Sequence, residues 1–319
     1  MNTFTIQADN ANQRLDKFLL KYFNKATKGL IYKLLRNKRI KLNGARAEGN
    51  EILQEGDALT FYIAPETMAE LMEARTIRTD CAALSVIYED AQVLLADKPS
   101  GLLTQPDAPG ADCVSERLLA YLAKKGEFVT AAGGTFTPAP VNRLDRNTSG
   151  LVLCAKTLAA AQVLSAALRE RDGGLEKYYL AVVVGRVDKA MTLSGVHQRD
   201  ARTNVASIKN VDVTEVSGED GKDAVTEIVP VSHGDGFSVL CVKLLTGRTH
   251  QIRAHLQSIG HPIVGDPKYG DAKANRAFDV KGQLLCAYKL QVGVLGEPLA
   301  YLEGQVFRAP LPVGFERFV

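Results

Sequence analysis

Short apolar runs bounded by turn-forming residues dominate the chain from residue 85 onward, and they restrict it to a fold built on a sheet. Val86–Tyr88 and Val93–Ala96 flank a Glu-Asp turn, as the two strands of a hairpin would. Ala224–Val231 and Phe237–Leu245 form a second such pair, and Tyr178–Val184 is a further β-rich run. Helical patterns are fewer and cover residues 114–122 and 158–168. The sequence therefore predicts an α+β fold with a mainly antiparallel mixed sheet and flanking helices.

Two stretches interrupt this pattern. Residues 65–84 contain Pro65 and alternating charges, which favour a linker with one short helical turn near Met68–Glu73. Residues 186–224 are polar with little periodicity, which indicates turns and short strands. We expect three parts: a small α+β domain over 1–64, a linker over 65–84 and the main domain over 85–319.

The N-terminal segment has a different spacing of apolar residues. Residues 14–23 place Leu15, Phe18, Leu19 and Tyr22 on one stripe, which predicts an amphipathic helix. A second short helix is expected over residues 30–35. The alternating residues 39–42 then lead into Asn43-Gly44, a pair typical of a tight hairpin turn.

Basic charge is concentrated in this segment. Residues 1–63 hold seven Lys and four Arg against three Asp and three Glu, a local net charge of +5 in a chain whose total is +3. A solvated helix face usually mixes signs, whereas a stripe of one sign favours a phosphate backbone. The layout resembles the S4 RNA-binding domain, and the cations that would contact RNA are Lys28, Lys33, Arg36, Lys38, Arg39 and Lys41.

The stretch Asn142–Gly150 carries the clearest candidate for chemistry. Asp145 stands between Arg143 and Arg146, ahead of small turn-formers and the apolar strand Leu151–Ala155. A surface ion pair would explain the same letters and would contribute only ~0–1 kcal/mol. Arg14-Leu15-Asp16 repeats the tripeptide, but it leads into a helix rather than a turn. A carboxylate just before the start of a strand, in a chain expected to bind nucleic acid, is consistent with hydrolysis, glycosyl exchange or isomerisation of a nucleotide.

A resemblance narrows these options. Residues 142–151 resemble the signature of the RluA-type pseudouridine synthases. Three further segments are similar to the family's motifs in order and spacing: Tyr88–Asp90 with Asp97–Gly101, Glu176–Val183, and Thr246–His255 with Gly260–Asp266. Asn142 stands where the family most often has His, and Cys286-Ala287 stands where His-Ala is frequent. These departures put substrate choice in doubt.

The resemblance implies an enzyme that isomerises uridine to pseudouridine without a cofactor. Asp145 matches the catalytic aspartate, Arg253 its pairing arginine, and Tyr179 the aromatic residue that stacks on the base. Arg143 matches the residue that fills the space of the flipped nucleotide, whose removal from the stack costs a few kcal/mol. Arg248 is expected to bind phosphate beside a helix N-terminus.

The RNA expected is large-subunit (23S) ribosomal RNA, because the S4-plus-catalytic layout is similar to that of the ribosomal enzymes of the family. Transfer RNA is an alternative substrate. Two other functions stay open: a catalytically silent RNA-binding or ribosome-assembly factor, and an RNA N-glycosylase that would release uracil. An assay for isomerised uridine separates the synthase from a silent factor, and chromatography of free uracil would detect the glycosylase.

Composition sets the remaining expectations. No apolar run approaches the ~18 residues of a membrane span, and the N-terminus lacks the pattern of a signal peptide. Five scattered cysteines without a Cys-x-x-Cys motif favour reduced thiols in a cytoplasm. His250, His255 and His261 are not spaced for one helical face, so no metal is expected. No dinucleotide or phosphate-loop motif occurs, and we expect a cytoplasmic monomer.

Overall fold

The computed structural model describes residues 2–7, 10–72, 78, 80–128, 136–170, 174–200, 205–210, 222–280 and 282–319. Residues 1–82, 118–139 and 156–159 form one compact unit, called here the first unit. Residues 83–117, 140–155 and 160–319 form the second unit. The predicted linker includes a helix, α3 (Pro65–Glu70), while its residues 73–77 and 79 lie outside the described part. The domain boundaries at 64 and 84 stay a prediction.

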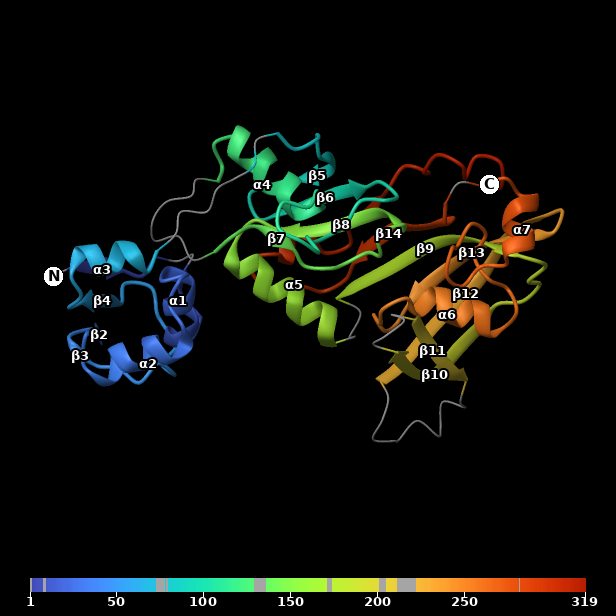
Figure 1. Cartoon of the computed structure of the whole chain (residues 1–319). Helices are drawn as coiled ribbons and strands as arrows, with labels where there is room; N and C mark the ends of the chain where they lie inside the picture. Colours follow the sequence, from blue (N-terminus) through green and yellow to red (C-terminus); the bar gives the residue numbers. More distant parts are fainter. Residues whose placement is uncertain are drawn as a thin grey trace. The chain divides into compact units, whose positions relative to one another are not determined.

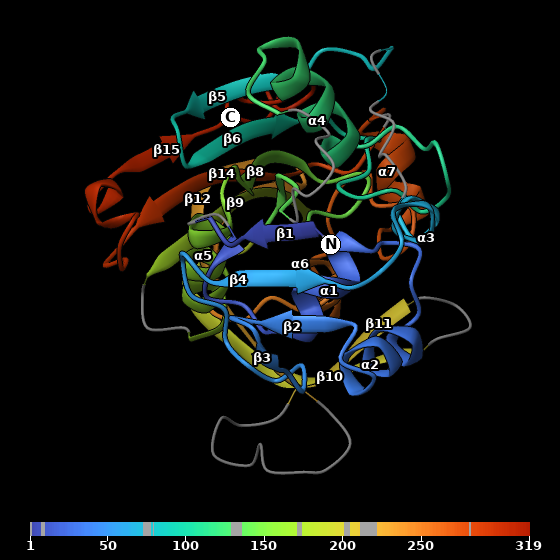
Figure 2. The same cartoon turned by 90° about the vertical axis from the view of Figure 1, so that its left-hand side faces the viewer.

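The first unit contains a small sheet covered by two helices. Its strands follow the order β1 (Asn2–Thr5), β4 (Ala58–Phe61), β2 (Ile40–Leu42) and β3 (Ala45–Arg46), all antiparallel (Figure 2). Helices α1 (Leu15–Tyr22) and α2 (Lys28–Arg36) occupy the predicted positions. Asn43 and Gly44 both have positive φ, at 49° and 76°, as a tight hairpin turn requires.

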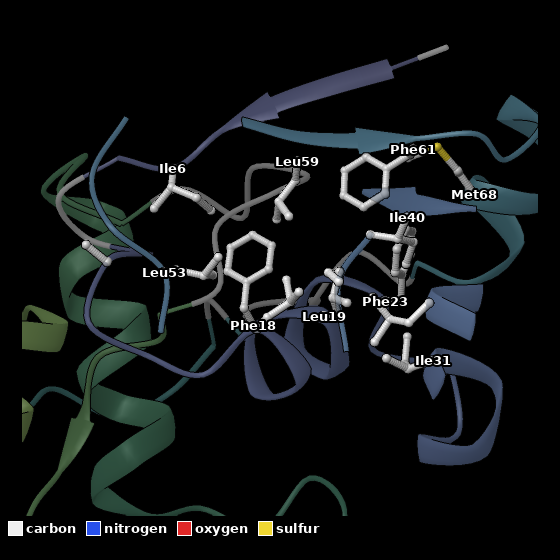
Figure 3. Packing of buried hydrophobic residues seen from close by; sticks show 14 residues of the cluster. Ile6, Phe18, Leu19, Phe23, Ile31, Ile40, Leu53, Leu59, Phe61 and Met68 are labelled. Carbon is white, nitrogen blue, oxygen red and sulfur yellow. The ribbon is translucent and has the colours of Figure 1, made fainter. Parts of the chain in front are cut away.

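The apolar stripe of α1 builds the core of this unit. Phe18 and Leu19 are fully buried and point toward Leu59 and Phe61 of β4 (Figure 3). Thr27 caps α2, because its side chain accepts a hydrogen bond from the Leu30 N–H at 3.2 Å. The basic side chains of both helices are exposed to solvent.

The second unit is built on a long sheet, as the hairpin pattern predicted. Its strands in chain order are β5 (Ser85–Glu89), β6 (Val93–Lys98), β7 (Ala139–Pro140), β8 (Ser149–Ala155), β9 (Leu175–Val184), β10 (Met191–Asp200), β11 (Val205–Asn210), β12 (Lys222–Gly234), β13 (Phe237–Leu244), β14 (Leu285–Val292) and β15 (Val306–Arg308). They pair in the order β11-β10-β12-β13-β9-β14-β8-β6-β5, with β15 beside β14 and β7 beside β8 (Figure 1). Among the strand pairs with a described register, β14 with β8 is parallel and the others are antiparallel.

Further helices lie between and after these strands in the chain. α4 (Val114–Lys124) and α5 (Leu158–Glu170) lie where the sequence predicted them, and α6 (Gln251–Ser258), α7 (Ala272–Ala277) and the short 3-10 helix η3 (Ala300–Leu302) follow β13 in the chain. α6 packs against β11 and β12 (Figure 1). No helix in the described ranges has the length and apolar character needed to cross a membrane.

One stretch differs from the prediction. Within residues 186–224 the structure has the ten-residue strand β10 and strand β11, where turns and short strands were expected. Residues 201–204 and 211–221 lie outside the described part. The pattern was missed because Leu193 and Gly195 are buried on one face of β10 while polar residues occupy most other positions.

Candidate active site

The turn between β7 and β8 presents Asp145. The N–H of Thr148 donates to the Asp145 carbonyl at 3.1 Å and closes the turn. The N–H of Leu144 donates to Thr104 Oγ1 at 3.1 Å, and that hydroxyl donates back to the Leu144 carbonyl at 3.0 Å. Because these bonds fix the backbone on both sides, the Asp145 side chain, 26% exposed, projects from a constrained loop.

A buried lysine holds the same loop. Lys98 ends β6 with no exposed surface, and its Nζ donates to the carbonyls of Leu102 at 2.7 Å, Arg146 at 2.8 Å and Pro99 at 3.1 Å. Burial lowers the pKa of Lys98 to about 8, although the charge of Asp145 opposes this shift. Three carbonyl partners satisfy the three donors of an ammonium, so Lys98 ties β6 to the Asp145 turn. No role was predicted for Lys98; a lysine at the end of an apolar strand was the available signal.

Arg253 of α6 bridges two carboxylates. Its Nη1 donates to Asp145 Oδ2 at 3.1 Å, while Nε and Nη2 donate to Asp266 at 2.7 and 2.8 Å. Burial opposes ionisation of Asp266, but Arg253 and two backbone N–H groups outweigh it and hold the pKa of this carboxyl below its usual value. The bidentate pair fixes the plane of the guanidinium, and with it the side of Asp145 that is contacted. Asp266 lay within a recognised motif, but the sequence did not indicate its contact with Arg253.

His250 also faces Asp145, which the sequence did not indicate. Its Nε2 lies 3.8 Å from Asp145 Oδ2, and its Nδ1 lies 3.0 Å from the Tyr269 hydroxyl. That hydroxyl accepts the Ala206 N–H at 2.6 Å and can donate its own proton to Nδ1; in that tautomer Nε2 carries the imidazole proton and points it at Asp145. Burial lowers the pKa of His250 although Asp145 opposes this, which favours the neutral ring.

The backbone of His250 is unusual. It precedes α6 with φ of 57°, a left-handed conformation that costs a non-glycine residue of order 1–3 kcal/mol. Its side chain does not cap the helix. Gln251 instead accepts the Arg248 N–H at 3.0 Å, so that amide is not free for the phosphate expected at this helix N-terminus.

Tyr179 lies in β9 with its side chain toward Asp145. It is 7% exposed, and burial, followed by the negative charge of Asp145, raises the pKa of its phenol. Tyr178 lies on the opposite face, as strand alternation predicted: its hydroxyl donates to Glu176 at 2.8 Å and Lys289 Nζ lies 3.7 Å from its ring centroid. A raised pKa keeps Tyr179 protonated near neutral pH.

Asp145, Tyr179, His250 and Arg253 line one cavity of about 1090 Å³ within the second unit. Of the residues predicted for the site, its wall contains Arg143, Asp145, Tyr179, Arg248 and Arg253. The volume exceeds the usual 300–1,000 Å³ of a small-ligand pocket, which suits a nucleotide with its flanking backbone.

The structure shows the surroundings of the two residues that depart from the family pattern, Asn142 and Cys286. Asn142 Oδ1 accepts the Leu153 N–H at 2.8 Å, so this side chain links the Asp145 segment to β8. Cys286 is fully buried in β14. Burial raises the pKa of its thiol to about 12, so the group is neutral.

The predicted RNA-binding cations of the first unit lie on and after α2. Lys28, Lys33, Arg36, Lys38 and Arg39 are exposed, and Lys41 is partly exposed with its Nζ 5.2 Å from the Tyr62 ring centroid. None of the six forms an ion pair with a carboxylate of the described residues. Their charge is therefore available to a phosphate backbone.

No metal site accompanies the cavity in the described part of the chain, where three potential His, Cys, Asp or Glu ligands do not come together. His250 and His255 instead have partners within the protein: His255 Nδ1 lies 2.8 Å from Thr226 Oγ1. None of the five cysteines forms a disulfide in the described part of the chain.

Comparison with known proteins agrees with this geometry. Residues 92–258 match the family model for RNA pseudouridylate synthase, and residues 13–59 match that for the S4 domain. An uncharacterized RNA pseudouridine synthase of Bacillus subtilis is 33% identical over 98% of this chain and 95% of the relative. Ribosomal large subunit pseudouridine synthase D of Xanthomonas campestris is 31% identical, over 95% of this chain and 86% of the relative.

A solved structure supports the fold. Human RNA pseudouridylate synthase domain containing 1 superposes with a TM-score of 0.52 at 24% identity, over 77% of this chain and 95% of that one. The chain therefore belongs to the RluA-type RNA pseudouridine synthases, isomerases of uridine in RNA, and it carries an S4 domain.

Proposed function

We propose that this enzyme isomerises specific uridines of large-subunit (23S) ribosomal RNA, with Asp145 as the catalytic group and without a cofactor or metal. Relatives named as ribosomal large subunit pseudouridine synthases C and D, in Haemophilus ducreyi and Xanthomonas campestris, support the choice of RNA. We place it in the cytoplasm, acting as a monomer.

The observation that carries the role of Asp145 is the one-sided contact to its carboxylate. Arg253 and His250 both approach Oδ2, and Oδ1 has no hydrogen-bond partner among the described residues. The carboxylate is thus held at one oxygen while the other is available to a nucleotide in the cavity. Fixing a reacting group in this way lowers the entropic part of the barrier.

The reaction needs no external atoms. The N1–C1′ bond breaks, the base turns, and a C5–C1′ bond forms; C5 loses one proton and N1 gains one. Oδ1 of Asp145 acts on the bound nucleotide, and Tyr179 provides an aromatic surface for the base with a phenol available for proton transfer. Arg143, exposed on the cavity rim, fills the space that the target uridine leaves, and Arg248 holds backbone phosphate.

Asp145→Asn tests the proposal. With ribosomal RNA transcripts labelled by tritium at uridine C5, we expect tritium release to fall by at least ~10²–10⁴-fold while RNA binding is kept. Asp107→Asn is the matched control, because Asp107 lines the same cavity but is 60% exposed and lies 3.7 Å from Arg146. Retained turnover in Asp145→Asn would refute the catalytic role, and release from transfer RNA alone would redirect the substrate.

A further inference from the structure

Lys177 is a cation of the cavity wall with no role in the proposed chemistry. It lies in β9 two residues before Tyr179, so the two side chains share one face of the strand and both line the cavity. Its neighbours across the sheet are Leu244 of β13 and Leu290 of β14. The ammonium therefore extends from an apolar part of the sheet toward the cavity.

Three other cations of this wall have acceptors within the protein, and a fourth, Arg143, is exposed and therefore solvated. Arg253 has two carboxylates, Arg248 Nε donates to the Asp223 carbonyl at 3.1 Å, and Arg169 Nε donates to the Ser165 carbonyl at 3.2 Å. Lys177 has no hydrogen-bond or ion-pair partner among the described residues, although it is partly buried. Within the part of the chain that the structure describes, this ammonium is therefore open to an acceptor on the substrate.

Burial without compensation is costly for an ammonium. It lowers the pKa of Lys177, and no carboxylate offsets the shift. An ammonium that stays charged without a carboxylate partner can bind an anion, and the anion of an RNA substrate is its phosphodiester.

Gly247 leaves the approach to this ammonium open. The glycine is exposed, and a Cβ added to it would lie 4.0 Å from Lys177 Nζ. We propose that Lys177 binds an oxygen of the phosphodiester next to the target nucleotide in the substrate RNA. This phosphodiester would lie in the space beside Gly247. The inference rests on the proposed function, since it takes the target nucleotide to lie between Asp145 and Tyr179.

The test measures RNA affinity against salt in an Asp145→Asn background, so that no turnover occurs. The probe is whichever labelled transcript, from ribosomal or transfer RNA, the unsubstituted enzyme modifies. Lys177→Met should weaken binding roughly 10- to 100-fold, as expected for a lost charged hydrogen bond. It should also reduce the slope of log affinity against log salt by about 0.7–0.9. Lys177→Arg should restore most of both.

Lys243→Met is the matched control, because Lys243 lies on the neighbouring strand β13, outside the cavity wall, and pairs with Glu176. An unchanged slope in Lys177→Met, with the fold intact by circular dichroism, would overturn the phosphate contact. So would a loss of kcat at saturating RNA with unchanged affinity when Lys177→Met is made alone, with Asp145 intact, because that result would place Lys177 on the reacting base. Full activity of Asp145→Asn alone would reject the proposed function but would not alter the salt measurement.

Discussion

Asp266→Asn isolates the residue that orients Arg253. Asp266 has a side chain 0% exposed, and Arg253 one 6% exposed. Two hydrogen bonds of 2.7 and 2.8 Å join them. Removing one partner of a buried pair costs up to about 3–5 kcal/mol, and Arg253 would then keep only its single contact to the more exposed Asp145. Arg253 then loses its fixed plane, and a displacement of about 1 Å at Asp145 would lower kcat by roughly 10²-fold.

The assay is urea unfolding followed by circular dichroism, fitted with a separate transition for each compact unit. Glu176→Gln is the control: it also breaks a Lys or Arg contact to a carboxylate, but both partners are about one-quarter exposed, at 25% and 26%. That change should cost only ~0–1 kcal/mol. If Asp266→Asn destabilises the second unit no more than Glu176→Gln, the reasoning about the buried pair is wrong.

The same variant has a defined pH dependence. The folded-state pKa of Asp266 is depressed, so its contribution to stability is present above the unfolded value of about 3.9 and is lost as pH falls through the folded value. The difference in unfolding free energy between wild type and Asp266→Asn should be constant from about pH 7 to 5 and shrink below about pH 4. A difference that grew toward acid would contradict this sign.

Two further predictions concern the RNA anchor and the centre of the sheet. Charge reversal at Lys33, Arg36 and Arg39 should weaken RNA binding and flatten its salt dependence by up to ~0.9 per phosphate contact; unchanged affinity in a filter-binding assay would remove the S4 role. Gly150→Ala should destabilise the second unit by at least ~1–3 kcal/mol, because φ is 102° and the added Cβ would lie 2.3 Å from a carbonyl oxygen of β14. Gly296→Ala, where nothing lies within 4 Å, should change stability by no more than about 0.5 kcal/mol, and equal melting temperatures would refute the clash.

Local patterns in the sequence predicted local structure well. The stripe of α1, the Asn43-Gly44 turn and the hairpin of β5 and β6 depend on neighbouring residues, and all three are present. The insertion of β14 between β8 and β9 was not predicted, because periodicity carries no information about which distant strand is the partner.

The candidate site was likewise predicted only in part. Motif resemblance named Asp145, Tyr179 and Arg253, and the structure brings them to one cavity; their roles stay proposals. The contacts of His250 and Asp266 could not be inferred, since each depends on where separate elements meet in space. Lys177 was part of a recognised motif, but only the structure shows that its charge has no partner among the residues described.

The position of β14 has a consequence for the order in which the enzyme matures. Strands β5 to β8 precede residue 156, strands β9 to β13 span residues 175–244, and β14 at 285–292 joins the two groups through a parallel pairing with β8 and an antiparallel pairing with β9. A growing chain therefore contains Asp145, Tyr179 and Arg253 well before the strand that unites their supports. Such distant pairing folds slowly, since loop closure precedes any gain from contact. We therefore expect the enzyme to be inactive until residues 285–292 have been synthesised and β14 has joined the two groups of strands.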